Sequence, residues 1–203
     1  MDPIIPPIVL ASASPRRKML LEQLGLPFTI RASEIEEDLQ QPLPPDQLAE
    51  TLALQKAQNV ANSFDQDALV IGADTIVVDG QGILGKPRDE ADAYRMLSRL
   101  SGQTHRVITG LAVISTFHPE RTLVKHETTH VTFAHLSKQD IQWYIHIREP
   151  LDKAGAYAIQ GKGMAFVERI QGCYYNVVGL PVFLLLRMLE EVTGEFDLEH
   201  LLR

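Results

Sequence analysis

A chain of 203 residues with a formal net charge of −7 has the composition of an ordinary soluble globular protein, with 45% hydrophobic and 22% charged residues. The negative charge argues against a general nucleic-acid-binding protein, which would normally present a basic surface. The single cysteine, Cys173, excludes an internal disulfide and a multi-cysteine zinc site, and it fits a reducing compartment.

The sequence carries no signature of export or membrane insertion. The first residues, MDPIIPPIVLAS, contain several prolines and lack a basic segment, so we expect no secretory peptide. The longest apolar run, PVFLLL, is far shorter than the roughly 20 residues that a membrane span needs. We therefore expect a cytoplasmic protein that binds neither membrane nor nucleic acid.

Predicted strands alternate with predicted helices along the whole chain. Strands are expected at residues 8–11, 28–32, 69–78, 106–115, 123–133 and 165–170. One more strand is expected to return directly after the Asp79–Gly80 turn. The helices are expected at about 15–24, 46–62, 89–102 and 137–147, and from Pro181 onward. Because Asp-Gly between apolar flanks is a strong hairpin signal, at least one strand pair is antiparallel. The sequence thus predicts an α/β fold over residues 1–203 as a single domain, with a mixed, twisted sheet and flanking helices.

The first helix begins with an unusual charge pattern. In LASASPRRKMLLEQLG, Ser14 and Pro15 are predicted as the N-cap and the first helical residue. Arg16, Arg17 and Lys18 then fill the first turn, where the helix dipole is already positive, and each cation costs about 0.3–1 kcal/mol. An arginine doublet such as Arg16–Arg17 is most often a solvated surface feature. A capped helix N-terminus after a buried strand, however, also favours a bound anion.

Three charged residues interrupt apolar patterns elsewhere. Asp74 lies within the predicted core strand, where an ionised carboxylate needs a partner or a backbone turn to stabilise it. Lys86 is predicted to lie opposite Asp74 across the hairpin to within about one residue, so both can lie at the same end of the sheet, and a structural ion pair is an alternative to a functional one. Lys56 falls on the apolar stripe of the second helix, where its stem could simply cover the edge of the core.

Together these residues favour a phosphate site. Arginine forks suit phosphate oxygens and lysines supply point charges, so we expect Arg16, Arg17, Lys56 and Lys86 to bind an anion beside the hydroxyls of Ser12 and Ser14. Asp74 and the acids Glu34, Glu36 and Glu37 could then hold a divalent ion against a polyphosphate, since Mg²⁺ is usually bound by one or two carboxylates plus substrate phosphates.

Two other patterns are interpreted as not being functional motifs in themselves. GQGILGKP fits G-x-x-x-x-G-K, but it has proline where a P-loop needs Ser or Thr, and it begins in a hairpin turn. The aromatic run Trp143–Ile145 lies on a predicted capped helix and is interpreted as packing.

A family resemblance is carried by five segments in order: LASASPRR, IGADTIVV, GKPRDEADAYRMLSRLSGQTH, EPLDKAGAYAIQGKG and NVVGLP. They resemble the Maf family of nucleoside triphosphate pyrophosphatases from about Ile8 to Leu189. The resemblance implies an elongated, two-lobed fold related to inosine triphosphate pyrophosphatases, with a central cleft. It also implies cleavage between the α- and β-phosphates of a nucleotide, assisted by a divalent cation (Mg²⁺, Mn²⁺ or Co²⁺).

The resemblance also implies roles for individual residues. By position, Asp74 is similar to the family's proton acceptor, and Glu37 is similar to its second acidic residue on the metal side. The phosphate-binding set corresponds to Ser12, Arg16, Arg17, Lys56 and Lys86. Arg16, Thr75 and Gln160 match the positions that mark the branch acting on dTTP and UTP. Ala158 stands where a glycine is expected, a small change that we expect to leave activity intact.

Three functions remain open at the level of sequence. A dTTP/UTP pyrophosphatase is the leading hypothesis, and the same chemistry on another or a modified nucleobase is the second. A nucleotide-binding regulator of septum formation without catalytic activity is the third. The roles of Asp74 as general base and as metal ligand are not separable, and the oligomeric state is open, with a homodimer as one alternative.

Overall fold

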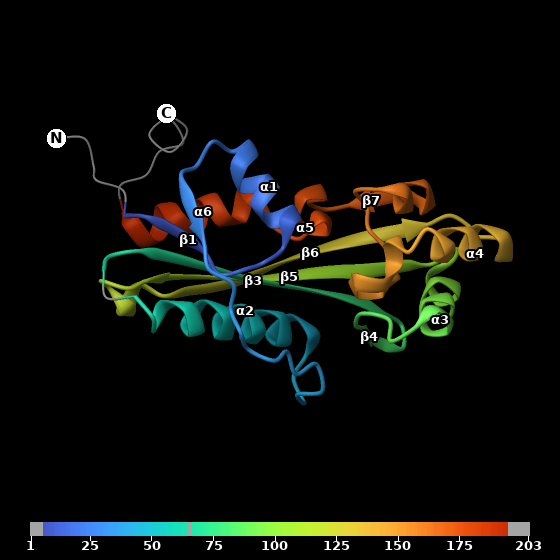
Figure 1. The fold of residues 1–203 in the computed structure, drawn as a ribbon, viewed down its shortest axis with the longest axis horizontal. Coiled ribbons are helices and arrows are strands. Elements are labelled where there is room, and N and C mark those ends of the chain that lie inside the picture. Colours follow the sequence, from blue (N-terminus) through green and yellow to red (C-terminus); the bar gives the residue numbers. More distant parts are fainter. Residues whose placement is uncertain (1–5, 65, 195–203) are drawn as a thin grey trace. The chain divides into compact units, whose positions relative to one another are not determined.

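The structure is a computed structural model that describes residues 6–64 and 66–194. A mixed β-sheet runs through it, with helices packed against the sheet (Figure 1). The described strands are β1 (Ile8–Leu10), β2 (Phe28–Ile30), β3 (Leu69–Asp79), β4 (Gly82–Leu84), β5 (Thr104–Ser115), β6 (Leu123–Phe133) and β7 (Val167–Gln171). Their order is β2-β1-β3-β5-β6-β7, and β4 pairs with β3. Because β1 pairs in parallel with β2 and β3 while β3–β4 and β6–β7 are antiparallel, the predicted mixed sheet is confirmed.

Helices follow the strands as expected. The longer ones are α1 (Pro15–Gln23), α2 (Pro45–Ala61), α3 (Glu90–Leu100), α4 (Lys138–His146) and α6 (Val182–Thr193). The shorter ones are α5 (Tyr174–Val178) and the 3₁₀ turns η1 (Pro119–Arg121), η2 (Glu149–Asp152), η3 (Ala154–Ala156) and η4 (Lys162–Phe166). The helix α5 was not predicted, because it forms within a segment that reads as a turn.

Local capping signals place two of these helices accurately. Asp89 accepts a hydrogen bond from the backbone of Asp92 at the start of α3, and Ser137 with Asp140 forms a capping box at the start of α4. Ser14 is the N-cap residue of α1, but the predicted cap through its hydroxyl is wrong, because its side chain makes no capping hydrogen bond. The helix ends as expected, with Gly25 in the left-handed region at φ 73°.

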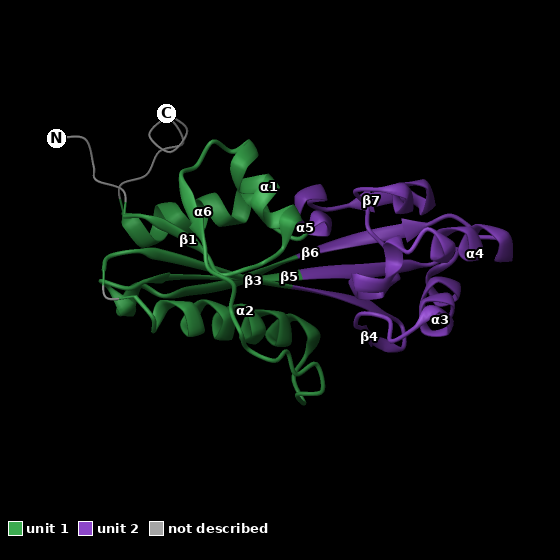
Figure 2. Ribbon diagram, in the orientation of Figure 1, with its two compact units in different colours: residues 1–74, 109–127, 179–203 green, residues 75–108, 128–178 purple. Residues whose placement is uncertain are grey.

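The chain divides into two compact units (Figure 2). Unit 1 comprises residues 1–74, 109–127 and 179–203, and unit 2 comprises residues 75–108 and 128–178. The boundaries fall inside β3, β5 and β6, so each of these strands contributes residues to both units. The expectation of a single domain and of an elongated shape with a central cleft stays a prediction.

Within unit 1, helices cover both faces of the sheet. In Figure 1, α2 lies along one face, and α1 and α6 lie on the other. Small and β-branched residues fill the α2 side, among them Val9, Ala53, Val60, Val70 and Ala112. This small-residue core lets α2 pack closely against β1 and β3.

Unit 2 has a core rich in aromatic side chains. Leu97 from α3, Phe133 from β6, Tyr144 from α4 and Phe166 from η4 are all buried in one cluster. The rings of Phe133, Tyr144 and Phe166 meet edge to face, which adds to the stabilisation from burial alone.

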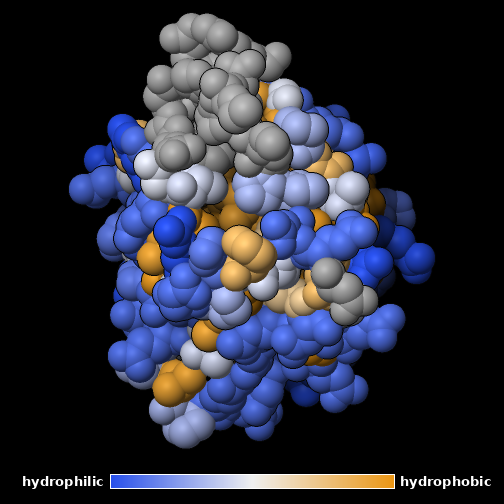
Figure 3. Space-filling view, turned by 90° about the vertical axis from the view of Figure 1, so that its left-hand side faces the viewer, coloured by the Kyte–Doolittle hydropathy of each residue, from blue (hydrophilic) through white to orange (hydrophobic). Residues whose placement is uncertain are grey.

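One face of the molecule is mainly polar. The face drawn in Figure 3 is mostly hydrophilic, and its hydrophobic residues form small, separate patches. Among the described helices, none combines the length and the hydropathy that a bilayer crossing requires.

Candidate active site

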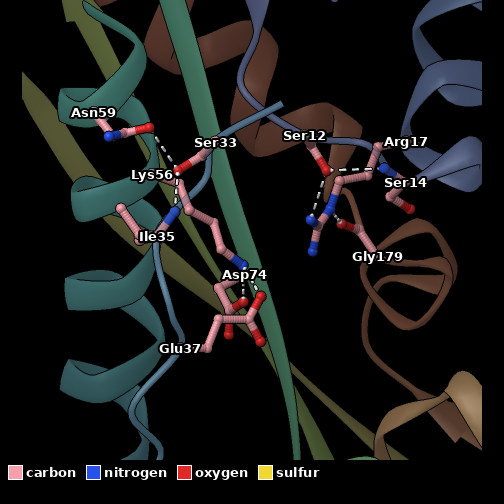
Figure 4. A network of polar contacts seen from close by, with 10 residues as sticks. All are labelled: Ser12, Ser14, Arg17, Ser33, Ile35, Glu37, Lys56, Asn59, Asp74 and Gly179. Carbon is pink, nitrogen blue, oxygen red and sulfur yellow. Dashed lines mark hydrogen bonds and ion pairs between the residues drawn. The ribbon is translucent and has the colours of Figure 1, made fainter. Parts of the chain in front are cut away.

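The segment after β1 places a hydroxyl and a guanidinium together. β1 is completely buried, and its hydrogen bonding to β3 continues one residue further, because the Ala11 amide donates to the Ile71 carbonyl at 2.8 Å. Ser12 follows directly, and its Oγ accepts from the Ser14 amide at 3.2 Å and from Nη1 of Arg17 at 3.1 Å. The hydroxyl of Ser12 is therefore held at the start of α1 (Figure 4).

The three cations of the first turn of α1 have three different environments. Arg17 is buried, with 9% of its surface exposed, and its Nε donates to the carbonyl of Gly179 at 2.8 Å. Lys18 is exposed and pairs with Glu22 one turn later at 3.5 Å. Arg16 is only partly buried. The cluster is thus not a uniform solvated surface, because Arg17 is part of the protein interior.

A close approach between α2 and β3 brings Lys56 to Asp74. A Cβ on Gly72 would lie 2.2 Å from the carbonyl oxygen of Ala53 and 2.8 Å from the Cβ of Ala57, so only glycine fits there. Side chains two residues apart point to the same face of a strand, so Asp74 faces α2 as Gly72 does. Lys56 lies on the α2 face between Ala53 and Ala57, which directs its stem toward Asp74.

Lys56 and Asp74 form a buried ion pair to which Glu37 is added. Nζ of Lys56 donates to Oδ1 of Asp74 at 2.5 Å and to Oε1 of Glu37 at 2.6 Å. The side chains of Lys56 and Asp74 are 10% and 6% exposed, whereas that of Glu37 is 38% exposed. The predicted burial of Asp74 is confirmed, and its partner is Lys56, whose ammonium is buried with it and does not extend from the edge of the core.

The loop that carries Glu37 is attached to α2. Oδ1 of Asn59 accepts two hydrogen bonds, one from Oγ of Ser33 at 3.1 Å and one from the Glu34 amide at 3.3 Å. The Ile35 amide in turn donates to Oγ of Ser33. These bonds lead the chain past α2, so that Glu37 reaches Lys56 one turn of helix before Asn59 (Figure 4).

Electrostatics connect Arg17 with the two carboxylates. Burial lowers the pKa of the Arg17 guanidinium, and the negative charges of Asp74 and Glu37 oppose that shift, while the neighbouring charge of Arg16 adds to it. An arginine remains protonated even after such a shift. The charges of Arg17, Lys56, Asp74 and Glu37 therefore act on one another within unit 1.

The location of this cluster matches a general rule for α/β sheets. β1 lies between β2 and β3, and the connections through α1 and α2 run on opposite faces of the sheet. Ligands bind in such sheets beyond the carboxyl ends of the strands, where the strand order reverses. Ser12 follows β1, Glu37 follows β2, and Asp74 extends β3 beyond the end of β1, so the cluster surrounds that switch point.

The carboxylate pair fits a hard divalent cation. Asp74 and Glu37 both have an oxygen within hydrogen-bonding distance of a single point, the ammonium of Lys56. Two carboxylates held at one point are the protein ligands that Mg²⁺ commonly uses, with phosphate oxygens and water completing its shell. Among the described residues no group of three or more His, Cys, Asp or Glu side chains forms a complete metal site. The donor set therefore suits a cation that binds together with a phosphate ligand.

The other predicted site residues belong to unit 2. Thr75 follows Asp74 in β3, and Gln160 lies between η3 and η4, and both are partly buried. The cation that pairs with Asp74 is Lys56 and not Lys86. The expected register is close, because the pairing of Val77 with Leu84 would, if continued, place Lys86 opposite Thr75, next to Asp74. The register pairs Val77 with Leu84, and β4 ends at Leu84, so Lys86 lies outside the hairpin ladder and is exposed. The G-x-x-x-x-G-K segment forms this hairpin and is not a P-loop.

Sequence reasoning missed the groups that orient the cluster. Asn59 holds the acidic loop, and the carbonyl of Gly179 holds Arg17, yet nothing in the residue types signals either role. The small residues Gly72, Ala53 and Ala57 did carry a signal, because small side chains at facing positions allow a helix and a strand to approach closely.

Comparison with known proteins places the chain in a family. The sequence model of the family described as Maf-like protein matches residues 7–192 of this chain. A dTTP/UTP pyrophosphatase of Alkaliphilus oremlandii (strain OhILAs) is 53% identical over 176 residues, which cover 87% of this chain and 91% of that protein. A dTTP/UTP pyrophosphatase of Bacillus cereus (strain Q1) is 51% identical over 193 residues, covering 95% and 98%.

A structural likeness is more distant. A nucleoside-triphosphatase / dITP/XTP pyrophosphatase from Mycobacterium abscessus superimposes with a TM-score of 0.41 at 17% identity, covering 64% of this chain and 74% of that one. The family assignment depends instead on the sequence matches, which extend over nearly the whole chain at more than half identity. The chain belongs to the Maf family.

Proposed function

We propose that this chain is a nucleoside triphosphate pyrophosphatase that hydrolyses dTTP and UTP to the nucleoside monophosphate and pyrophosphate. The relatives at 51–53% identity carry the name dTTP/UTP pyrophosphatase. The observation that carries the proposal is the buried Lys56–Asp74 pair with Glu37, beside Ser12 and Arg17 at the switch point of the sheet. Such a set of cations and acids suits a polyphosphate with its metal ion.

The proposed roles combine the family resemblance with the chemistry of each side chain. Ser12, Arg16, Arg17, Lys56 and Lys86 neutralise and orient the phosphate chain, and Asp74 accepts a proton from the water that attacks the α-phosphorus. The bond from the α-phosphorus to the bridging oxygen breaks, and pyrophosphate leaves with that oxygen. A divalent cation (Mg²⁺, Mn²⁺ or Co²⁺) bound by Asp74 and Glu37 supplies Lewis-acid stabilisation of charge on the phosphates.

The base is recognised separately from the phosphates. Gln160 offers both a hydrogen-bond donor and an acceptor, and the hydroxyl of Thr75 offers either, which suits the edge of a uracil or thymine ring. Together with Thr75 and Gln160, Arg16 matches the positions that mark the branch of the family acting on dTTP and UTP. We place the reaction in the cytoplasm, where removal of unwanted nucleotides protects the nucleotide pool. A homodimer stays an alternative for the oligomeric state.

A nucleotide panel with product identification tests the proposal. Purified protein with Mg²⁺, Mn²⁺ or Co²⁺ is given dTTP, UTP, CTP, ATP and GTP, and pyrophosphate and orthophosphate are measured separately. Release of pyrophosphate with highest kcat/KM for dTTP and UTP supports it. Release of orthophosphate alone excludes this reaction, and tight nucleotide binding without turnover favours the regulator.

A further inference from the structure

Gln160 lies in a segment of unit 2 that has little regular structure. It falls between η3, which ends at Ala156, and η4, which begins at Lys162. A short connection of this kind positions a side chain precisely only if its backbone is tied to rigid elements. The hydrogen bonds on both sides of Gln160 therefore decide where its amide points.

Tyr144 and Glu149 provide those bonds from outside the segment. On the N-terminal side of Gln160, the Ala158 amide donates to Oη of Tyr144 at 3.1 Å. On the C-terminal side, the amides of Lys162 and Gly163 donate to Oε2 and Oε1 of Glu149 at 3.0 and 3.2 Å. Oη of Tyr144 itself donates to Oε1 of Glu149 at 3.0 Å, which joins the two sides.

The two clamping side chains are held by the fold of unit 2. Tyr144 is fully buried in α4, and its ring packs edge to face against Phe166 at a centroid distance of 4.9 Å. Arg148, the N-cap residue of η2, adopts a left-handed backbone at φ 60° and turns the chain after α4 has ended. Glu149 follows directly and lies beside Tyr144. The clamp therefore depends on α4, the most clearly capped helix of the unit.

The glycines of the segment fit closely against the clamp. A Cβ on Gly161, whose φ is 136°, would lie 2.4 Å from Oε1 of Glu149. A Cβ on Gly163 would lie 2.6 Å from Oη of Tyr144 and 2.6 Å from the Ala158 carbonyl. Both glycines of the GKG sequence are thus required by the approach of this segment to Tyr144 and Glu149.

We propose that Glu149 and Tyr144 are positioning residues for nucleobase selection, because they clamp the backbone on both sides of Gln160. This inference rests on the proposed function, in which Gln160 reads the pyrimidine edge. In this role neither residue needs to touch the substrate. Their effect is to fix the direction of the Gln160 amide, so that a base with the wrong donor and acceptor pattern meets mismatched groups and is rejected.

The clamp itself is tested without substrate, by amide hydrogen exchange of the folded protein. Tyr144→Phe removes the acceptor for Ala158 and keeps the ring in the core, and Glu149→Gln leaves only one carbonyl oxygen for the two amides. We expect exchange at least about tenfold faster at Ala158 in the first variant, and at Lys162 or Gly163 in the second. Tyr94→Phe and Glu168→Gln are the matched controls in the same unit, and they should leave these amides unchanged.

The selection role is tested by kcat/KM for UTP and CTP in the same variants. Because a misplacement of about 1 Å can cost up to about 100-fold, we expect the UTP:CTP ratio to fall about tenfold, mainly through KM for UTP. Glu149→Gln should lower the UTP:CTP ratio less than Glu149→Ala does. In a Gln160→Ala background, neither Tyr144→Phe nor Glu149→Gln should change the ratio further.

The outcomes separate this inference from the proposed function. If the wild type releases pyrophosphate from UTP but folded Tyr144→Phe and Glu149→Gln keep the wild-type UTP:CTP ratio, the positioning role is wrong and the proposed function stands. If the variants lower the ratio equally with Gln160 present or replaced by alanine, the clamp acts on something other than Gln160, and the inference is again wrong. A wild type that hydrolyses no nucleotide overturns both.

Discussion

Lys56 and Asp74 form an ion pair inside unit 1, with Nζ 2.5 Å from Oδ1 and both side chains at most 10% exposed. A buried pair of this kind contributes little net stability, because the desolvation of two charges offsets their attraction. Removing one partner alone is costly, however, since the other charge is left buried. Net stability therefore does not explain why the pair is present, whereas the role in phosphate and metal binding that we propose does.

Asp74→Asn should lower turnover by about 100- to 10,000-fold, the range expected for loss of a general base. Nucleotide binding should be kept or strengthened, because the substitution removes a negative charge near the phosphates. Pyrophosphate release and calorimetric titration with dTTP measure the two effects. Asp67→Asn, at an exposed position of the same unit, is the matched control. Wild-type turnover in folded Asp74→Asn would contradict the role of Asp74.

Lys56→Met should leave Asp74 and Glu37 without their shared cation, and we expect a loss of up to about 3–5 kcal/mol in the free energy of unfolding. A divalent cation can take the place of the ammonium between the two carboxylates. Mn²⁺ should therefore raise Tm more in this variant than in the wild type, in the absence of nucleotide. An equal effect of Mn²⁺ on both proteins would argue against Asp74 and Glu37 as metal ligands.

Arg16→Ala and Arg17→Ala should have different consequences although the residues are adjacent. Arg16 is partly exposed in the first turn of α1, so its loss should weaken nucleotide binding with unchanged or slightly higher Tm. Arg17 is buried and donates to the Gly179 carbonyl, so its loss should lower the free energy of unfolding by about 1–3 kcal/mol. Thermal unfolding with and without dTTP measures both, and Lys18→Ala is the control. If the Arg16→Ala variant fails to fold, Arg16 has a structural role and not a binding role.

Gly72→Ala should destabilise the protein by about 1–3 kcal/mol, the usual cost of overpacking, because its Cβ would lie 2.2 Å from the backbone oxygen of Ala53. The displacement of α2 should also separate Lys56 from Asp74 and reduce turnover. Gly80→Ala is the matched control, since a Cβ there meets nothing within 4 Å. Denaturant unfolding compares the two, and equal midpoints would show that α2 and β3 are not closely packed.

His105 should make stability depend on pH. It is 2% exposed, and its Nε2 lies 2.8 Å from Oη of Tyr157. Burial lowers the pKa of His105 from 6.5 to about 4, despite the opposing charge of Asp79. Between these values the unfolded chain binds the proton and the folded chain does not. Stability should thus fall by up to about 3 kcal/mol as pH falls from 6.5 to about 4.

The control for this pH dependence is His105→Gln, which keeps a polar partner for Tyr157 but does not titrate. Denaturant unfolding at several pH values in this window should give a flatter profile for the variant. If wild type and variant lose stability equally as the pH falls, other groups cause the acid sensitivity.

The sequence was a good guide to local structure, because strands, caps and hairpins depend on neighbouring residues. The strand β1, the α4 capping box and the β3–β4 turn all follow from patterns within a few residues. It also identified Asp74 and Lys56 as functional candidates, since a charge within an apolar pattern needs a partner wherever it is buried. What it could not give was the partner, which depends on contacts between distant segments.

Two examples show what only the tertiary structure decided. Lys86 is the nearest cation to Asp74 by hairpin spacing, but β4 ends at Leu84, and the cation that meets Asp74 is Lys56 from α2. Tyr144 reads as a packing residue in its helix, yet its hydroxyl also holds Ala158 and Glu149. Propensity and periodicity act over a few residues, so they predict most of the elements and which faces of them are apolar. The direction in which a buried polar group finds its partner is set by how closely helices and strands pack, as at Gly72 against Ala53, and that depends on the whole fold.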